Sequence, residues 1–280
     1  MLERGDLVRP VFPRSSNKPL QAVGMLRAGW QPADDRALAL ATASHSGEER
    51  HLAVVREMLA GVEEAALGCP PMLPLSEPAA HALLARGEQA TPLTMNCSGK
   101  HAAMLLTCLA NGWPLATYLD QADPLQVALT AAVEELAGER VLHVAVDGCG
   151  APQHALTLPG LARAFSRLVD AAPGTPERRV ADAMRAHPEL VGGTGRDVTA
   201  LMQGVPGLLA KDGAEGLYAV ALPGVGAVAL KVEDGAARAR TPVLVGALRA
   251  LGVEGGVLEE LATVPVLGGA GVVGEVRGTV

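Results

Sequence analysis

The sequence predicts an α+β fold in which a largely helical part is followed by an antiparallel sheet. Before about residue 140, apolar side chains recur at helical spacing. Beyond it, short Val- and Leu-rich runs and Gly-containing turns become frequent. Helices first and a meander of strands later are typical of α+β proteins. Since no repeat, linker or low-complexity segment interrupts residues 1–280, we expect a single domain.

Composition and charge exclude several classes of function. The formal net charge of −7 argues against nucleic acid or an anionic membrane as a partner. No apolar run is long enough to span a bilayer and the N-terminus has no apolar signal segment, so we expect a cytoplasmic protein. Four cysteines in such a chain indicate free thiols rather than a disulfide framework.

Capping residues and prolines predict where the first helices begin. Pro19 is compatible with a first helical turn, so a helix is expected from near Ser16. A second helix follows over about 34–43. Ser46 and Glu49 have the spacing of a capping box, which predicts the start of a third helix.

The later elements follow from changes in period and from turn residues. The expected helices are a short one after the Pro-rich segment 69–78, then 97–110, 124–136, 160–171, 177–186, a short one after Arg196, and 241–251. The expected strands are 141–146, 208–210, 216–222, 226–231 and 272–277, with a turn at 211–213.

Ser15 and Lys18 form a Ser-x-x-Lys pattern that suggests nucleophilic catalysis. Residues three apart in a helical turn share a face, so the ammonium of Lys18 can reach the hydroxyl of Ser15. A desolvated lysine there can act as the base that activates the serine. The alternative is a helix cap followed by a solvated lysine. Lys211 in a late Lys-x-Gly favours catalysis, because penicillin-recognising serine enzymes show this order.

Cys97 and Lys100 occupy a tight turn that opens into a helix. The partial positive charge of a helix start favours the thiolate of a cysteine, and a thiolate beside a lysine is a nucleophile, a metal ligand or an ion-pair partner. Cys149 follows a predicted strand and could complete a zinc site, although the chain lacks the usual Cys-x-x-Cys pattern. Two independent buried cysteines are the alternative. Asp147 ends the strand as either a functional carboxylate or a turn former.

Six segments in this order resemble the asparaginase II family, the rhizobial-type or class 3 L-asparaginases. The likeness runs from about residue 9 to 277. The segments are Arg14-Ser-Ser-Asn-Lys-Pro-Leu-Gln21, Ala43-Ser-His-Ser-Gly-Glu48, Asn96-Cys-Ser-Gly-Lys-His101, Asp147-Gly-Cys-Gly-Ala-Pro152, Gly193-Thr-Gly-Arg196 and Ala210-Lys-Asp-Gly-Ala-Glu-Gly216.

The resemblance implies an amidohydrolase that converts L-asparagine to L-aspartate and ammonia, on a fold related to serine β-lactamases and glutaminases. It also implies a homodimer. By matching motifs, the catalytic pairs are Ser15 with Lys18 and Ser44 with Lys211. The implied zinc ligands are Cys97, Lys100 and Cys149, and the implied substrate-binding residues are Arg14, His101 and Asp147. Which of the two serines is the nucleophile stays open.

The chain departs from the family pattern in two places, and two other functions remain as alternatives. Family members generally carry a longer segment ahead of Arg9, which forms the opening strands. The chain is therefore truncated, started at the wrong Met or genuinely short, and we expect the last strand to lack these partners. The family's aromatic residue after Gly195-Arg196 is replaced here, since the chain continues with Asp197. The rivals are a non-catalytic homologue that binds a small molecule or senses redox state, and a serine acyl transferase acting on β-lactams or peptides.

Overall fold

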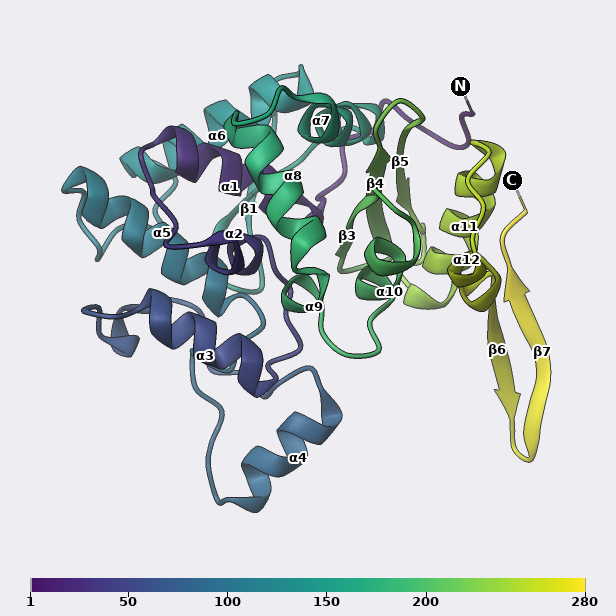
Figure 1. Cartoon of the computed structure of the whole chain (residues 1–280), viewed down its shortest axis with the longest axis horizontal. Coiled ribbons are helices and arrows are strands. Elements are labelled where there is room, and N and C mark those ends of the chain that lie inside the picture. Colours follow the sequence, from purple (N-terminus) through teal and green to yellow (C-terminus); the bar gives the residue numbers. More distant parts are fainter. Residues whose placement is uncertain (1, 280) are drawn as a thin grey trace.

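The computed structural model describes residues 2–279 and places most of the helices to one side of a three-stranded antiparallel sheet (Figure 1). This confirms the α+β prediction. The helices are η1 Arg14–Asn17, α1 Lys18–Arg27, α2 Asp35–Ala41, α3 Glu49–Met58, η2 Glu64–Ala66, α4 Glu77–Ala85, α5 Ser98–Asn111, α6 Pro124–Ala137, α7 Leu158–Asp170, α8 Pro176–Ala186, α9 Pro188–Val191, α10 Asp197–Gly204, η3 Ala237–Ala239, α11 Arg240–Ala250 and α12 Gly256–Leu261. The strands are β1 Val144–Val146, β2 Pro152–His154, β3 Leu209–Gly213, β4 Leu217–Leu222, β5 Gly226–Lys231, β6 Thr263–Gly268 and β7 Gly271–Arg277.

Side-chain caps set the helix starts, with one difference from expectation. Asp34 accepts a hydrogen bond from the backbone of Ala37 and begins α2, as expected from the second helical run. The predicted capping box of α3 is wrong, because Glu48 and His51 form it. The Ser46 hydroxyl instead donates to the carbonyl of Gly192, and this bond ties the loop before α3 to the loop after α9.

The central sheet runs β3-β4-β5, with α7 and α11 packed against it from opposite sides (Figure 1). Because both faces are covered, Leu217–Ala221 of β4 is buried throughout. The expected turn at 211–213 is wrong: Lys211 pairs with Ala219, and β3 continues to Gly213. Lysine and aspartate are uncommon in strands, so composition alone ends this strand too early.

Tight helix packing brings the start of α5 against the end of α2. A Cβ atom at Gly99 would lie 2.6 Å from the carbonyl oxygen of Leu40, so only glycine fits there. The loop that follows α2 and the first turn of α5 are therefore neighbours, although about sixty residues separate them. This contact places Ser44 beside Cys97.

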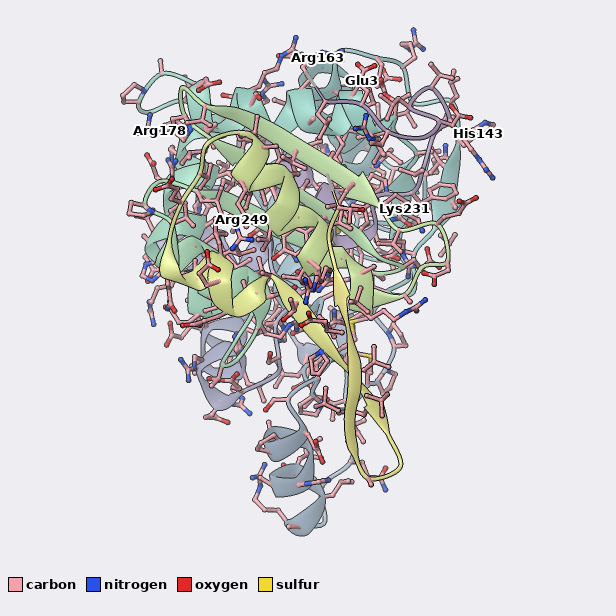
Figure 2. All side chains as sticks on the ribbon, turned by 90° about the vertical axis from the view of Figure 1, so that its right-hand side faces the viewer. Glu3, His143, Arg163, Arg178, Lys231 and Arg249 are labelled. Carbon is pink, nitrogen blue, oxygen red and sulfur yellow. The ribbon has the colours of Figure 1, made fainter. Side chains whose placement is uncertain are left out.

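Six elements are absent from the sequence prediction: η2, β2, α9, η3, α12 and β6. All are six residues or fewer, too short for a period to register. Within the described chain, β7 pairs with β6, and the hairpin extends away from α11 and α12 (Figure 2). Val266, Leu267, Val272 and Val273 are exposed on it.

Candidate active site

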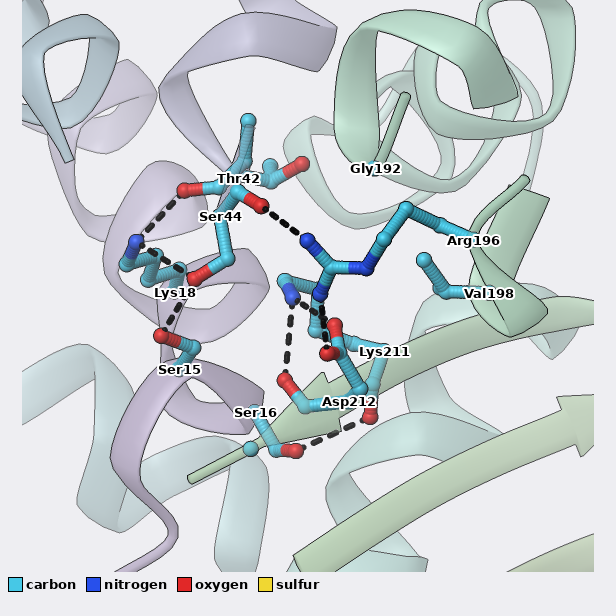
Figure 3. Close-up of polar contacts among 12 residues, drawn as sticks. Ser15, Ser16, Lys18, Thr42, Ser44, Gly192, Arg196, Val198, Lys211 and Asp212 are labelled. Atoms are coloured by element: carbon cyan, nitrogen blue, oxygen red, sulfur yellow. Dashed lines mark hydrogen bonds and ion pairs between the residues drawn. The ribbon is translucent and has the colours of Figure 1, made fainter. Parts of the chain in front are cut away.

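Two serine hydroxyls from distant segments meet at the centre of the site. Ser15 lies in η1, and Ser44 lies in the loop after α2; the Oγ of Ser44 donates to the Oγ of Ser15 at 2.6 Å (Figure 3). Backbone hydrogen bonds to Val191 and Asn96 hold Ser44 and the next residue in place. The hydroxyl of Ser44 is thus held at a defined position on the floor of a cavity.

Lys18 is almost fully buried and contacts Ser44 directly. Its ammonium donates to the backbone oxygen of Ala43, to Ser44 Oγ at 3.2 Å and to Cys97 Sγ at 3.0 Å. Three acceptors match the three N–H groups of a lysine ammonium. The sequence predicted contact with Ser15, three residues earlier, whereas here Lys18 reaches Ser15 through Ser44.

Asn96 sets the direction of the Ser44 hydroxyl and was given no role from the sequence. Its amide donates to Ser44 Oγ at 3.2 Å. Because Ser44 Oγ already accepts from Lys18 and Asn96, its own O–H points to Ser15. The position of Asn96 directly before Cys97 was the available signal, but only the fold shows which side chain it faces.

Lys211 is buried and paired with its neighbour in the chain. The ammonium donates to the carboxylate of Asp212 at 2.6 Å and to the backbone oxygen of the same residue at 2.9 Å. Burial lowers the pKa of Lys211 to about 8, against the attraction of Asp212. Ser16 Oγ donates to the carbonyl of Lys211, which joins η1 to β3. The expected pairing with Ser44 is not among the hydrogen bonds found within residues 2–279.

Asp212 is surrounded by cations. Besides Lys211, its carboxylate lies 2.7 Å from Arg196 and 3.7 Å from Arg240. Burial favours the neutral acid, but these three cations hold the pKa of Asp212 well below its ordinary value. Arg240 also pairs with Asp197 at 2.8 Å.

Cys97, Lys100 and Cys149 converge as a thiol cluster, by which we mean these three side chains. Lys100 Nζ lies 3.1 Å from Cys149 Sγ, and Lys18 Nζ lies 3.0 Å from Cys97 Sγ. Contact with Cys149 and burial raise the pKa of Cys97, whereas contact with Cys97 and with Lys100 lowers the pKa of Cys149. Cys149 is therefore the thiol of this cluster that more readily becomes a thiolate.

His101 lies behind the thiol cluster rather than on the cavity wall. It is fully buried, and Nδ1 is 2.6 Å from the hydroxyl of Tyr118. That hydroxyl also accepts from the backbone N–H of Gly68, whereas Nε2 of His101 has no hydrogen-bond partner among the described residues. Burial lowers the pKa of His101, which favours the neutral ring.

Arg14 and Asp147 meet at the rim of the cavity. Arg14 Nε donates to Asp147 at 2.7 Å, and Glu215 lies 3.1 Å from the same guanidinium. Arg14 holds a φ of +50°, which is uncommon outside glycine and is typical of residues placed for function. The structure thus brings two of the three predicted substrate-binding residues to one wall.

A cavity of about 350 Å³ connects these groups. Its lining includes Ser15, Ser44, Cys97, Cys149 and Asn96, together with the charged residues Arg14, Asp147, Arg196, Asp212 and Arg240. Lys18, Lys100 and Lys211 lie behind this lining. A small polar molecule in the cavity would reach both a serine and a thiol.

A family model described as L-asparaginase II matches residues 1–278. The chain belongs to the L-asparaginase II family. Members of this family are amidohydrolases, and the family suggests hydrolysis of L-asparagine, a small-molecule substrate. The comparison with curated proteins found no match.

Every helix within residues 2–279 is too short or too polar to cross a membrane. In the same range, no three His, Cys, Asp or Glu side chains gather as a metal site. The thiol cluster supplies two sulfurs and depends on a lysine for its third donor, so zinc stays a prediction.

The cation cluster around Asp212 predicts a pH-dependent loss of stability. We expect Asp212→Asn to lower the free energy of unfolding at pH 7 by about 3–5 kcal/mol, because it leaves buried cations unpaired. The folded pKa lies below the unfolded one, so the pairing is fully present above about pH 4 and is lost as the pH falls further. Urea unfolding of wild type and variant from pH 7 to pH 3 measures this.

Asp234→Asn is the matched control for this test. Asp234 is half-exposed and paired with Arg238, so its removal should change stability little. If the Asp212→Asn effect were the same at every pH, Asp212 would act through packing rather than through its charge.

Proposed function

We propose that this protein is an L-asparagine amidohydrolase that releases L-aspartate and ammonia through a serine acyl-enzyme. The observation that carries the proposal is the hydrogen-bond chain from Ser15 through Ser44 to Lys18, which opens on the cavity in a member of this family. A hydroxyl linked to a buried lysine is how Ser-Lys enzymes activate a nucleophile. A cavity of about 350 Å³ suits a substrate of amino-acid size.

Exposure favours Ser15 as the nucleophile and Ser44 as the relay. Ser15 is half-buried and faces the cavity, whereas Ser44 is 5% exposed and is held by Lys18 and Asn96. In the attacking state Lys18 is neutral and accepts the O–H of Ser44, which turns away from Ser15, so that the hydroxyl of Ser15 donates to Ser44. The Oγ of Ser15 then bonds to the side-chain carbonyl carbon of asparagine, its proton passes to Ser44, and the Ser44 proton passes to Lys18.

Collapse of the tetrahedral adduct breaks the C–N bond. The proton held by Lys18 returns through Ser44 to the leaving nitrogen, so ammonia departs and an aspartyl ester remains on Ser15. Water then attacks this ester, again giving a proton to the Ser44–Lys18 pair. Aspartate leaves when Ser15 recovers its proton, and the enzyme returns to its starting state.

Lys211 is proposed to act through its charge. Its hydrogen bonds go to Asp212, so it is a less suitable base for Ser44 than Lys18 is. With a pKa of about 8 it is mostly charged at neutral pH. A buried cation beside the two serines stabilises negative charge that develops on the substrate oxygen.

We also propose that the thiol cluster holds zinc. Two sulfurs and one amine converge from buried positions, and this donor set suits zinc with one position left open. Zinc needs both cysteines as thiolates and Lys100 without its extra proton, so binding must release protons. A zinc ion there supplies a Lewis acid that orients the substrate, while bond breaking is assigned to the serines.

We also propose the fold relation, the oligomeric state and the location of the protein. The order of Ser15, Lys18 and Lys211, with the last on a strand, supports a fold related to serine β-lactamases and glutaminases. The family resemblance supports a homodimer and a single catalytic domain over residues 1–280. The cysteine usage of the sequence supports a cytoplasmic location.

Replacing the serines tests the assigned roles. We expect Ser15→Ala to lower kcat for L-asparagine by about four orders of magnitude or more, and Ser44→Ala to have a similar effect. Because the two hydroxyls act as one unit, the double variant should lose little more than either single one. Ammonia release measures kcat.

Ser76→Ala is the control, since Ser76 caps α4 and does not line the cavity. Near-wild-type activity in Ser15→Ala would sink the assignment and favour Ser44 as the nucleophile. L-Glutamine and a chromogenic β-lactam are measured in parallel, because turnover of the β-lactam alone would support the acyl-transferase alternative.

The zinc proposal predicts metal content. The purified protein should carry about one zinc per chain, and Cys97→Ala and Cys149→Ala should each lose it, because each removes one of only three protein ligands. Cys108→Ala is the matched control, since this buried thiol lies in α5 outside the thiol cluster. Zinc that persists at wild-type level in both cluster variants would contradict the site.

A further inference from the structure

Three arginines line the cavity, and their partners differ. Arg14 is paired with two carboxylates, Asp147 and Glu215. Arg240 gives its terminal nitrogens to Gly213 and Asp197, and its guanidinium lies over the ring of Tyr218. The third arginine of the lining is Arg196.

Arg196 has donors to spare. One terminal nitrogen donates to Asp212 at 2.7 Å, and the other lies 3.4 Å from the carbonyl of Ser44, a long hydrogen bond (Figure 3). A guanidinium has five N–H groups, so these two bonds leave three for another acceptor. A quarter of the side chain is exposed, about twice the fraction for Arg240.

The charges around Arg196 do not cancel. Lys211, Arg196 and Arg240 are three cations, and they face two carboxylates, Asp212 and Asp197. This end of the cavity therefore carries one excess positive charge at neutral pH. An anionic group of a ligand would be attracted to it, and a guanidinium binds a carboxylate through two parallel hydrogen bonds.

The opposite balance holds around Arg14. This guanidinium is paired with two carboxylates, Asp147 and Glu215, so the carboxylates outnumber it. The serine pair lies on the same cavity. Positive and negative ends flanking a nucleophile complement a zwitterionic α-amino acid whose side chain carries the amide.

The backbone around Arg196 holds it at this position. The carbonyl of Gly192 accepts from the backbone of Ser46 and from its hydroxyl. Gly193 has a φ of +134°, and a Cβ there would collide with Ser46. The loop that carries Arg196 is therefore fastened to the segment that carries Ser44.

We propose that Arg196 binds the α-carboxylate of the substrate and is the residue that selects α-amino acid amides over simple amides. The proposal rests on the proposed asparagine hydrolysis. It places the α-ammonium toward Asp147 and Glu215, and the side-chain amide toward Ser15.

A matched pair of amides tests this role. L-Asparagine and 3-aminopropanamide share the amide and the ammonium, but the second lacks the α-carboxylate. We expect Arg196→Gln to lower the ratio of their kcat/KM values by about 30-fold, equivalent to about 2 kcal/mol. Arg196→Lys, which keeps the charge, should lose less. Arg140→Gln, at an arginine that is 85% exposed, is the control and should keep the wild-type ratio.

A structural role for Arg196 gives a different result. If Arg196 only positioned Asp212, the variant would lower kcat/KM for both amides equally, and an unchanged ratio overturns the proposal. A collapse of the ratio in Arg14→Gln instead would move the carboxylate site to Arg14 and equally overturn it.

Binding of the products separates this inference from the reaction itself. Calorimetry with L-aspartate and 3-aminopropanoate needs no catalysis. Arg196→Gln should weaken L-aspartate by about the same 30-fold factor and leave 3-aminopropanoate nearly unchanged. If wild type hydrolyses neither amide but shows this binding pattern, the proposed function fails and the inference stands. Equal binding of L-aspartate to wild type and variant, or none to either, overturns the inference.

Discussion

A lysine ammonium with only 1% of its surface exposed needs an acceptor for each of its three N–H groups, and Lys18 finds them on two separate segments. Ala43 and Ser44 follow α2, and Cys97 precedes α5. Because an unpaired buried charge is strongly destabilising, these segments and α1 must come together for the chain to fold. The glycine at position 99 makes this approach possible. The contacts that satisfy Lys18 are the same ones that align Ser44 with Ser15.

This arrangement joins two chemistries in one site. Lys18 touches Ser44 on one side and Cys97 on the other, so the serine pair and the thiol cluster share a neighbour. Because Lys18 Nζ lies 3.0 Å from Cys97 Sγ, a change of charge on this thiol changes the electrostatic energy of the Lys18 ammonium, the proposed base. The second buried lysine, Lys211, is satisfied separately by Asp212, and the surrounding arginines leave a positive end to the cavity. Pairing of the buried cations thus stabilises the fold, and their charges prepare the cavity to bind negative charge.

Local sequence patterns predicted much of the fold, but features that depend on contacts between distant residues were not predicted. Caps such as Asp34 and the apolar period place the longer helices, because those signals lie within one element. The strand expected over 208–210 was ended too early, since the carboxylate of Asp212 is paired with Arg196, a group on another segment. The same holds for the site: spacing associated Ser15 with Lys18, but only the fold shows that Ser44 stands between them. Arg196 was noted only as part of the segment Gly193–Arg196 and was given no role, because its partners lie on other segments.

The proposed mechanism requires a covalent aspartyl ester on Ser15, and this intermediate can be trapped during turnover. The wild-type protein is mixed with excess L-asparagine, quenched in acid within the first turnovers, and digested for peptide mass spectrometry. We expect an aspartyl group on the peptide that contains Ser15 and none on the peptide that contains Ser44. An aspartyl group on Ser44, or an active enzyme whose quenched serines stay unmodified under all mixing times, would contradict it.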